Sequence, residues 1–336
     1  MDIMRDANIT DGMFPTKWAM KNAVPANDQF SVGAFADSAH EYLLKQWLLS
    51  GRSETKAKDL CMTFLLLPYV YPTQYSTTLL TDIPTDMRAV NGILKHLLYL
   101  TPERNLLYVT DVNGKYVSRT FEHLSCFLPG LLALGATTLA LPEDERRLHE
   151  WAAKGLAYTC WITYADHATG LGPDEIIMSE WREDPHKGRW LPHVEEWLAA
   201  GSPGGIPPGL REVEPKPVGE RDYFKRKDGY LLRPEASDVK WRERGWAVFQ
   251  AIEREAKTDS GYASLASVEH SPAGKKNEMP SFFMAETLKY LYLLFREDDP
   301  VPLDRWVFNT EAHPLPIFEW ASWEKTKYGI PQAVDH

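Results

Sequence analysis

Residues 37–50, DSAHEYLLKQWLLS, indicate the fold class because their apolar residues recur every three to four positions. This spacing gives a helix one apolar stripe, and Asp37 stands where an N-cap residue belongs. We therefore predict an amphipathic helix over these residues. The same period predicts further helices at residues 86–100, 127–139, 143–167, 239–257 and 282–296.

Two connections interrupt the helical pattern. The segments LLYVTD and KYVSRT flank Val112-Asn113-Gly114, and Asn-Gly favours the positive-φ positions of a tight β-hairpin turn. Residues 199–217 are rich in Pro and Gly and predict a loop that forms a lid or runs over the surface. Successive helices of similar length suggest a helical barrel or solenoid, although no fixed-period repeat supports it.

Residues 61–83, CMTFLLLPYVYPTQYSTTLLTDI, do not match their neighbours. Without them, the flanking segments would run together as one amphipathic helix. We interpret this stretch as an insertion foreign to the fold, such as translated intron. The alternative is a genuine loop with a short strand.

Composition excludes several classes of protein. The chain has 336 residues, 44% of them hydrophobic and 12% aromatic, which is too apolar for a disordered chain and allows two domains or one large one. A net charge of -10 excludes a general nucleic-acid binder and suits a cation or a neutral polar ligand. The chain has neither the basic, apolar start of a signal peptide nor an apolar run long enough to span a membrane.

Candidate functional residues lie at helix starts and in short connections. Each also has a purely structural interpretation. Asp37 can cap a helix, and the negative charge of Glu235 can be stabilised by the positive end of a helix dipole. Several carboxylates with an arginine and aromatic rings are nevertheless what a glycosidase needs. Motifs of zinc proteases, Walker loops, serine esterases and EF-hands do not occur. The candidates are Asp37, His40, His123, Asp174, Glu175, Arg233, Glu235, Glu286, Thr310, Glu311 and His313.

Six ordered blocks then carry a resemblance to a known family. They are FADSAHEYLLKQWLL, FEHLSCFLPGLLALGA, ATGLGPDEI, GYLLRPEASDVKWRERGWAVFQAIE, MPSFFMAETLKYLYLLF and WVFNTEAHPLPI. The chain resembles the glycoside hydrolase family 47 α-1,2-mannosidases from about Asp11 to Ile317. The resemblance implies an all-α (αα)7 barrel closed by a β-hairpin, with Ca²⁺ on the barrel floor. It also implies inverting hydrolysis of α-1,2-linked mannose on high-mannose N-glycans.

The resemblance assigns roles to individual residues. Asp37, Glu175 and Glu235 match catalytic acids, with Glu235 as the general base on water and Asp174 competing with Glu175 for its position. An inverting pair needs about 6.5–9.5 Å between its carboxyls to hold the water. Thr310 matches the calcium ligand, and waters and sugar hydroxyls would fill the other oxygen positions around the ion. Residues that match sugar or water contacts are His123, Arg233, Phe282, Glu286 and Glu311.

The cysteines fit the same family. Cys126 and Cys160 match a family disulfide and imply an oxidising lumen, which leaves Cys61 as the odd thiol. The resemblance therefore implies the endoplasmic reticulum or Golgi lumen, or secretion, for a full-length parent. We also expect a monomer.

Departures from the family pattern lead to a further expectation. The upstream helices of the family, with the general acid in a motif like LFEST, have no counterpart here. We expect residues 1–336 to form one N-terminally truncated catalytic domain. The parent would then carry any membrane anchor in its missing beginning. The barrel would expose apolar surface, and the chain alone would hydrolyse mannobiose at background rates.

Smaller departures and two other functions stay open. Phe35, Asp238 and Pro280 replace an Arg, a Glu and a Glu that many relatives carry, which puts the preference among mannose linkages or branches in doubt. The chain could instead be a non-hydrolytic mannose-binding relative that acts in the degradation of misfolded glycoproteins. A helical scaffold for protein partners is the third possibility.

Overall fold

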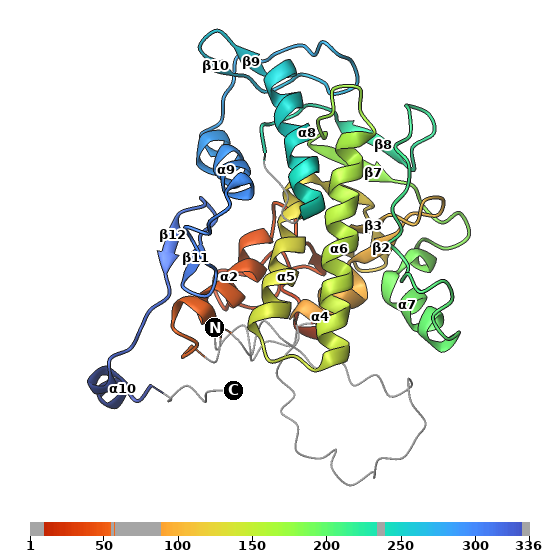
Figure 1. The fold of residues 1–336 in the computed structure, drawn as a ribbon. Coiled ribbons are helices and arrows are strands. Elements are labelled where there is room, and N and C mark those ends of the chain that lie inside the picture. The colour runs from red at the N-terminus through yellow and green to blue at the C-terminus, as the bar shows by residue number, and fades with distance from the viewer. Residues whose placement is uncertain (1–9, 55–56, 58–88, 234–238, 331–336) are drawn as a thin grey trace.

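The computed structural model describes residues 10–54, 57, 89–233 and 239–330. Helices dominate this part of the chain (Figure 1), and short 3₁₀ or π turns accompany them. The suspected insertion at residues 61–83 lies outside the described residues. The helices are α2 (Asp37–Leu49), α4 (Ala89–His96), α5 (Leu128–Thr138), α6 (Glu143–Ala165), α7 (Trp190–Ala199), α8 (Val239–Glu255), α9 (Lys289–Phe295) and α10 (Ser322–Tyr328).

The helices predicted from periodicity are confirmed, with two changes. The helix expected over residues 86–100 ends at His96 in the structure, and Leu98–Leu100 form a fully buried strand, β2. The helix expected over residues 282–296 begins as a π turn, η4 (Phe283–Leu288), and continues as α9. The periodicity did not lead us to predict the shorter helices α7 and α10.

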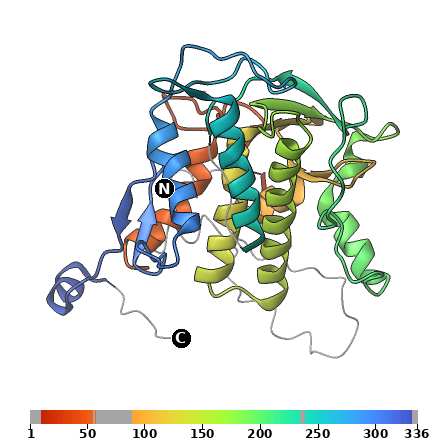
Figure 2. The ribbon, with the colours of Figure 1, turned by 45° about the horizontal axis from the view of Figure 1, so that its top comes forward.

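Helices α5, α6 and α8 form the centre of the described structure. A short connection, residues 139–142, joins α5 to α6, and α8 lies beside α6 in both views (Figures 1 and 2). Arg244 of α8 lies over the rings of Tyr158 and Trp161 of α6. The largest apolar core packs α2, α4, α5 and α6 against the strands, with residues such as Leu44, Ile93, Leu132 and Leu156 almost fully buried.

The structure contains more strand than the predicted all-α fold with one hairpin. The strands form small antiparallel sheets, some between neighbouring segments, as in β2–β3, and some between distant ones, as in β6–β7. They are β1 (Gln29–Phe30), β2 (Leu98–Leu100), β3 (Leu107–Val109), β4 (Val112–Asn113), β5 (Tyr116–Val117), β6 (Thr120–Glu122), β7 (Glu175–Met178), β8 (Tyr223–Lys227), β9 (Lys257–Thr258), β10 (Gly261–Tyr262), β11 (Trp306–Phe308) and β12 (Pro314–Pro316).

The predicted hairpin is partly correct. The Asn113-Gly114 turn joins β4 to β5, with Val112 opposite Val117 and Gly114 at φ 56°. The preceding segment, β3, pairs with β2 instead of with β5. Sequence spacing located the turn, but the strand that β3 joins became clear only from the three-dimensional packing.

The predicted disulfide is present. Cys126 and Cys160 are bonded, with their Cα atoms 6.1 Å apart. The bond joins the 3₁₀ turn η2 (His123–Phe127), which precedes α5, to the C-terminal half of α6. It therefore fixes the position of the turn that begins with His123.

Removing this disulfide is expected to lower the free energy of unfolding by about 2–4 kcal/mol, because the bond restricts the unfolded chain. Urea unfolding of a Cys126→Ala/Cys160→Ala variant measures the effect. Cys61→Ala is the matched control and is expected to unfold like the unmodified chain. Equal midpoints for the double variant and the unmodified chain would contradict the prediction.

The Pro/Gly loop between α7 and β8 is fastened to the surface and does not form a free lid. The Tyr158 hydroxyl accepts the Val213 amide and donates to the Val213 carbonyl, at 2.6 and 2.7 Å. Gly209 adopts φ 86°, and a Cβ there would lie 2.9 Å from the Leu107 Cβ. Only glycine fits this close approach without strain.

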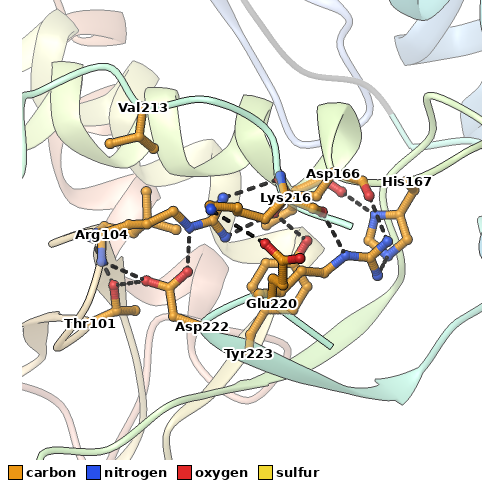
Figure 3. A network of polar contacts seen from close by, with 12 residues as sticks. Thr101, Arg104, Asp166, His167, Val213, Lys216, Glu220, Asp222 and Tyr223 are labelled. Atoms are coloured by element: carbon orange, nitrogen blue, oxygen red, sulfur yellow. Dashed lines mark hydrogen bonds and ion pairs between the residues drawn. The ribbon is translucent and has the colours of Figure 1, made fainter. Parts of the chain in front are cut away.

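A buried network of charges joins the end of α6, the β2–β3 turn and the start of β8 (Figure 3). Arg104 donates to both oxygens of Asp166, at 3.1 and 2.8 Å, and to Asp222. The side chains of Asp166 and Asp222 are 0% exposed. The Tyr223 hydroxyl and the Lys216 amide also donate to Asp166, so both of its carboxylate oxygens accept more than one hydrogen bond.

Apolar side chains remain exposed on one side of the described structure. Helix α9, KYLYLLF, has no buried residue. Trp246 of α8 is 50% exposed, and Tyr292 of α9 is 56% exposed. Within the described residues, no helix is both long enough and apolar enough to cross a membrane.

Candidate active site

The predicted site residues come from connections that lie far apart in the sequence. They occur at the start of α2, at the β6–η2 junction, before β7, after β8, in η4 and at the β11–β12 turn. Strands β7 and β8 lie toward the end of α6 where that helix finishes (Figures 1 and 2). The antiparallel order β6-β7-β8 therefore brings the segments next to His123, Asp174 and Arg233 to one end of the helices.

Arg233 lies close to two other predicted site residues, Asp174 and Phe282. Its Nε lies 3.8 Å from the Asp174 Oδ1, and its guanidinium carbon lies 5.3 Å from the centre of the Phe282 ring. The Nε atom is buried and has no hydrogen-bond partner among the described residues. A buried donor without a partner costs free energy.

The structure distinguishes the two competing acids. Asp174 is the carboxylate beside Arg233, whereas Glu175 accepts from Lys227 and forms an ion pair with Arg226 at 3.2 Å. Burial raises the pKa of Asp174, and the Arg233 charge opposes that rise. The geometry therefore favours Asp174 over Glu175 as the acid that faces a ligand of Arg233.

His123 is buried behind this site. Its Nε2 shares a hydrogen bond with the Tyr164 hydroxyl, and its Nδ1 has no partner among the described residues. Burial, and to a smaller extent the positive charge of Arg233, lower the pKa of His123 to about 3. The imidazole is therefore neutral at physiological pH. Gly172 lies against the Tyr164 ring, since a Cβ there would be 2.5 Å from a ring carbon.

Glu286 and Glu311 lie close enough to influence one another. Burial raises the pKa of Glu286, the negative charges of Glu311 and Glu41 raise it too, and Arg233 and Lys289 lower it. Lys289 Nζ donates to the Ala312 carbonyl at 2.6 Å, which connects α9 to the turn between β11 and β12. A bound cation would relieve the repulsion between these carboxylates.

Thr310 lies at the tip of the β11–β12 hairpin. It is exposed, and its Oγ1 lies 3.4 Å from the Tyr42 hydroxyl of α2. Its hydroxyl, with the carboxylates of Glu286 and Glu311 nearby, offers the oxygen donors that calcium prefers. No group of three or more His, Cys, Asp or Glu suited to a metal occurs among the described residues.

The other predicted residues are only partly placed. Asp37 is the first residue of α2, so it is not the N-cap, which is Ala36. Its Oδ1 accepts from the amide of Ser38 at 2.7 Å. His40 is buried and stacks on Phe14, which fits a role in the core. Glu235 lies outside the described residues.

Sequence reasoning overlooked three residues that contact the predicted ones. Tyr164 holds His123, Lys289 binds the hairpin tip, and Glu122 precedes His123 and accepts from the Ala34 amide. Of the three, only Glu122 could have been predicted from the sequence, because it stands beside His123 in FEHL. The other two come from helix positions whose periodicity indicates only a packed face.

Comparison with known proteins identifies the family. The profile of glycosyl hydrolase family 47 matches residues 1–317. The chain belongs to glycosyl hydrolase family 47. It is 30% identical over 326 residues to the mannosyl-oligosaccharide alpha-1,2-mannosidase IA of Drosophila melanogaster, covering 94% of this chain and 39% of that protein. It is 34% identical over 303 residues to the endoplasmic reticulum mannosyl-oligosaccharide 1,2-alpha-mannosidase of Rattus norvegicus, covering 86% and 37%. The chain thus spans less than half the length of these two family 47 relatives.

A solved family 47 fold is also similar. The alpha-1,2-mannosidase from Trichoderma reesei matches with a TM-score of 0.66 and 23% identity, over 94% of this chain and 59% of that chain. The described helices and strands therefore share the fold of that (αα)7 barrel.

Proposed function

We propose that the chain carries the mannose-binding part of a calcium-dependent, inverting α-1,2-mannosidase site that acts on high-mannose N-glycans. The observation that supports this most is the arrangement of Arg233 between Asp174 and the Phe282 ring. A sugar has hydroxyls that a guanidinium and a carboxylate bind, and C–H faces that pack on an aromatic ring.

The chemistry requires an acid and a base on opposite sides of the scissile bond. In the proposed mechanism Glu235 takes a proton from the attacking water, and Asp37 assists from the start of α2. The proton for the leaving sugar oxygen would come from the general acid of the family, whose motif does not occur in residues 1–336, so we propose that this chain by itself binds mannosides and hydrolyses them at background rates. Asp174, whose pKa burial raises, accepts from a sugar hydroxyl while Arg233 donates to another. Inversion requires space for the water between acid and base, about 6.5–9.5 Å.

Thr310 would hold the calcium through its side-chain and main-chain oxygens, and Glu286 and Glu311 would orient the waters around it. When bound, the ion would coordinate mannose hydroxyls and neutralise part of the negative charge of this region. The raised pKa of Glu286, caused partly by Glu311, supports a cation here.

Replacing Arg233 with methionine is expected to raise the dissociation constant for α-1,2-mannobiose by about tenfold or more, because charge-assisted hydrogen bonds are lost. Calorimetric titration measures this. Arg226→Met is the matched control, since Arg226 pairs with Glu175 and is exposed. Equal losses in both variants would contradict the role of Arg233, and no binding by the unmodified chain would refute the proposed function.

Thr310→Val is expected to weaken calcium binding by about tenfold, because one coordinating hydroxyl is replaced by a methyl group. The unfolding temperature of the chain, measured with increasing calcium, reports the affinity because a ligand stabilises the state that binds it. Thr326→Val is the control on α10, where the hydroxyl donates to the Ser322 carbonyl within the same helix. Identical calcium curves for all three proteins would exclude Thr310 as the ligand.

The disulfide supports an oxidising compartment for the proposed enzyme, as in the secretory pathway. The rat relative is named for the endoplasmic reticulum. We propose this lumen or the Golgi lumen, or secretion, as the place of action. We also propose that the protein works as a monomer.

A further inference from the structure

Glu122 makes a contact that crosses the candidate site. It is the last residue of β6 and stands next to His123. Its Oε2 accepts the backbone amide of Ala34 at 2.9 Å. Ala34 belongs to a turn in which the Gly33 carbonyl accepts the amides of Ala36 and Asp37, at 3.0 and 2.9 Å. A single carboxylate therefore connects the strand before His123 with the turn that starts α2.

This contact depends on a glycine. A Cβ on Gly33 would lie 2.4 Å from Oε2 of Glu122 and 2.9 Å from its carboxyl carbon. Real Cβ atoms do not approach so closely, so any other residue would push the carboxylate away from the turn. Gly33 and Glu122 thus form a matched pair, 89 positions apart in the sequence.

The charge around Glu122 makes a carboxylate an unexpected choice for a simple structural contact. Burial raises the pKa of Glu122, and the negative charges of Asp111, Glu175 and Asp174 raise it further. The hydrogen bond from the Ala34 amide lowers this pKa. A glutamine could accept the same hydrogen bond without this repulsion. Replacing Glu122 with glutamine therefore keeps the hydrogen bond and removes the charge, which separates the two effects.

The turn that Glu122 holds positions two side chains that could contact a ligand, those of Asp37 and Phe35. Asp37 follows it as the first residue of α2. Phe35 is 69% exposed although the residues beside it are hydrogen-bonded or buried. An exposed aromatic ring on a fixed turn is a surface on which a sugar face can pack.

We propose that Glu122 is a positioning residue that holds the Gly33–Asp37 turn, and with it Asp37 and Phe35, in place for a mannoside ligand. The assignment of the ligand rests on the proposed function. The assignment of the hydrogen bond does not, so the two are tested separately.

The test compares Glu122→Ala and Glu122→Gln with the unmodified chain. Hydrogen exchange of the Ala34 and Asp37 amides reports the turn, and calorimetric titration with α-1,2-mannobiose reports the ligand. We expect Glu122→Ala to accelerate exchange and to raise the dissociation constant, each by about tenfold. Glu122→Gln is expected to restore slow exchange and binding. Glu180→Ala, which removes a half-exposed carboxylate paired with Arg119, is the control and should change neither.

Each outcome decides one part of the proposal. Unchanged exchange at Ala34 in Glu122→Ala would refute the anchoring role. Accelerated exchange with unchanged mannobiose affinity would show that Glu122 holds the turn but does not affect ligand binding, which would overturn its positioning role. If the unmodified chain does not bind mannobiose, the proposed function fails, while the exchange result still decides the anchoring. If Glu122→Ala does not fold, titration of the Ala34 amide proton shift in the unmodified chain decides it, because that shift must follow the Glu122 carboxyl.

Discussion

Replacing Arg104 with methionine is expected to lower the free energy of unfolding by about 3–5 kcal/mol. The guanidinium is only 7% exposed and is the cation shared by Asp166 and Asp222, whose side chains are 0% exposed. Methionine fills a similar volume but leaves two buried carboxylates without a counter-charge. The cost arises from these uncompensated charges. Urea unfolding at neutral pH measures it.

Two further variants separate charge from packing in this network (Figure 3). Arg104→Met combined with Asp222→Asn is expected to recover part of the loss, because one of the stranded charges is removed. Arg146→Met is the matched control on the surface of α6, where Arg146 pairs with Glu143 at 2.7 Å and is more exposed. Its loss is expected to be much smaller, because solvent screens an exposed ion pair. Equal losses for Arg104→Met and Arg146→Met would contradict the prediction.

Acidification from pH 6.5 to pH 5 is expected to destabilise the chain steeply. Burial lowers the pKa of His40 and of His149 to about 4, and the pKa of His123 to about 3. The unfolded chain, with ordinary histidine pKa values near 6.5, binds protons in this range while the folded chain does not. Stability is therefore fully present above about pH 6.5 and is lost as the pH falls toward the folded-state values.

The size of this effect follows from the number of protons. Each buried neutral histidine contributes up to about 1.4 kcal/mol per pH unit, so the three together approach about 4 kcal/mol per unit near pH 5. Urea unfolding at several pH values measures the slope. His149→Leu is expected to reduce the slope by about one third, and His313→Gln, at an exposed position, to leave it unchanged. A slope that His149→Leu does not alter would show that this histidine is not buried in its neutral form.

The sequence predicted local structure well where the cause is local. The period of α2 and α6, the Asn113-Gly114 turn and the family disulfide all appear in the structure. It failed where an apolar segment that could continue a helix forms a β-hairpin instead. Strand β3 pairs with β2, and Leu98–Leu100 leave the predicted helix to form that pair. Their side chains are apolar in either conformation, so periodicity could not distinguish them.

For the site, the sequence supplied the residue types and the tertiary structure supplied their neighbours. Neighbouring acids in GPDE left Asp174 and Glu175 open, because either acid can match the family position and the sequence does not show which side chains surround each of them. The structure places Glu175 beside Lys227, through the pairing of β7 with β8, and places Asp174 beside Arg233. The contact of Glu122 with Ala34 is likewise invisible in the sequence.

The sequence alone therefore predicted the main helices, because these depend on residue identity and short spacing, and its resemblance to the family supplied the cysteine pair and the roles of the candidate acids. Only the tertiary structure decided which acid faces Arg233, that the Pro/Gly loop is fastened to α6, and that Arg104 must be buried between two aspartates. Burial and non-local pairing determine the charge, hydrogen bonding and accessibility of each side chain. Those quantities arise only when distant segments meet.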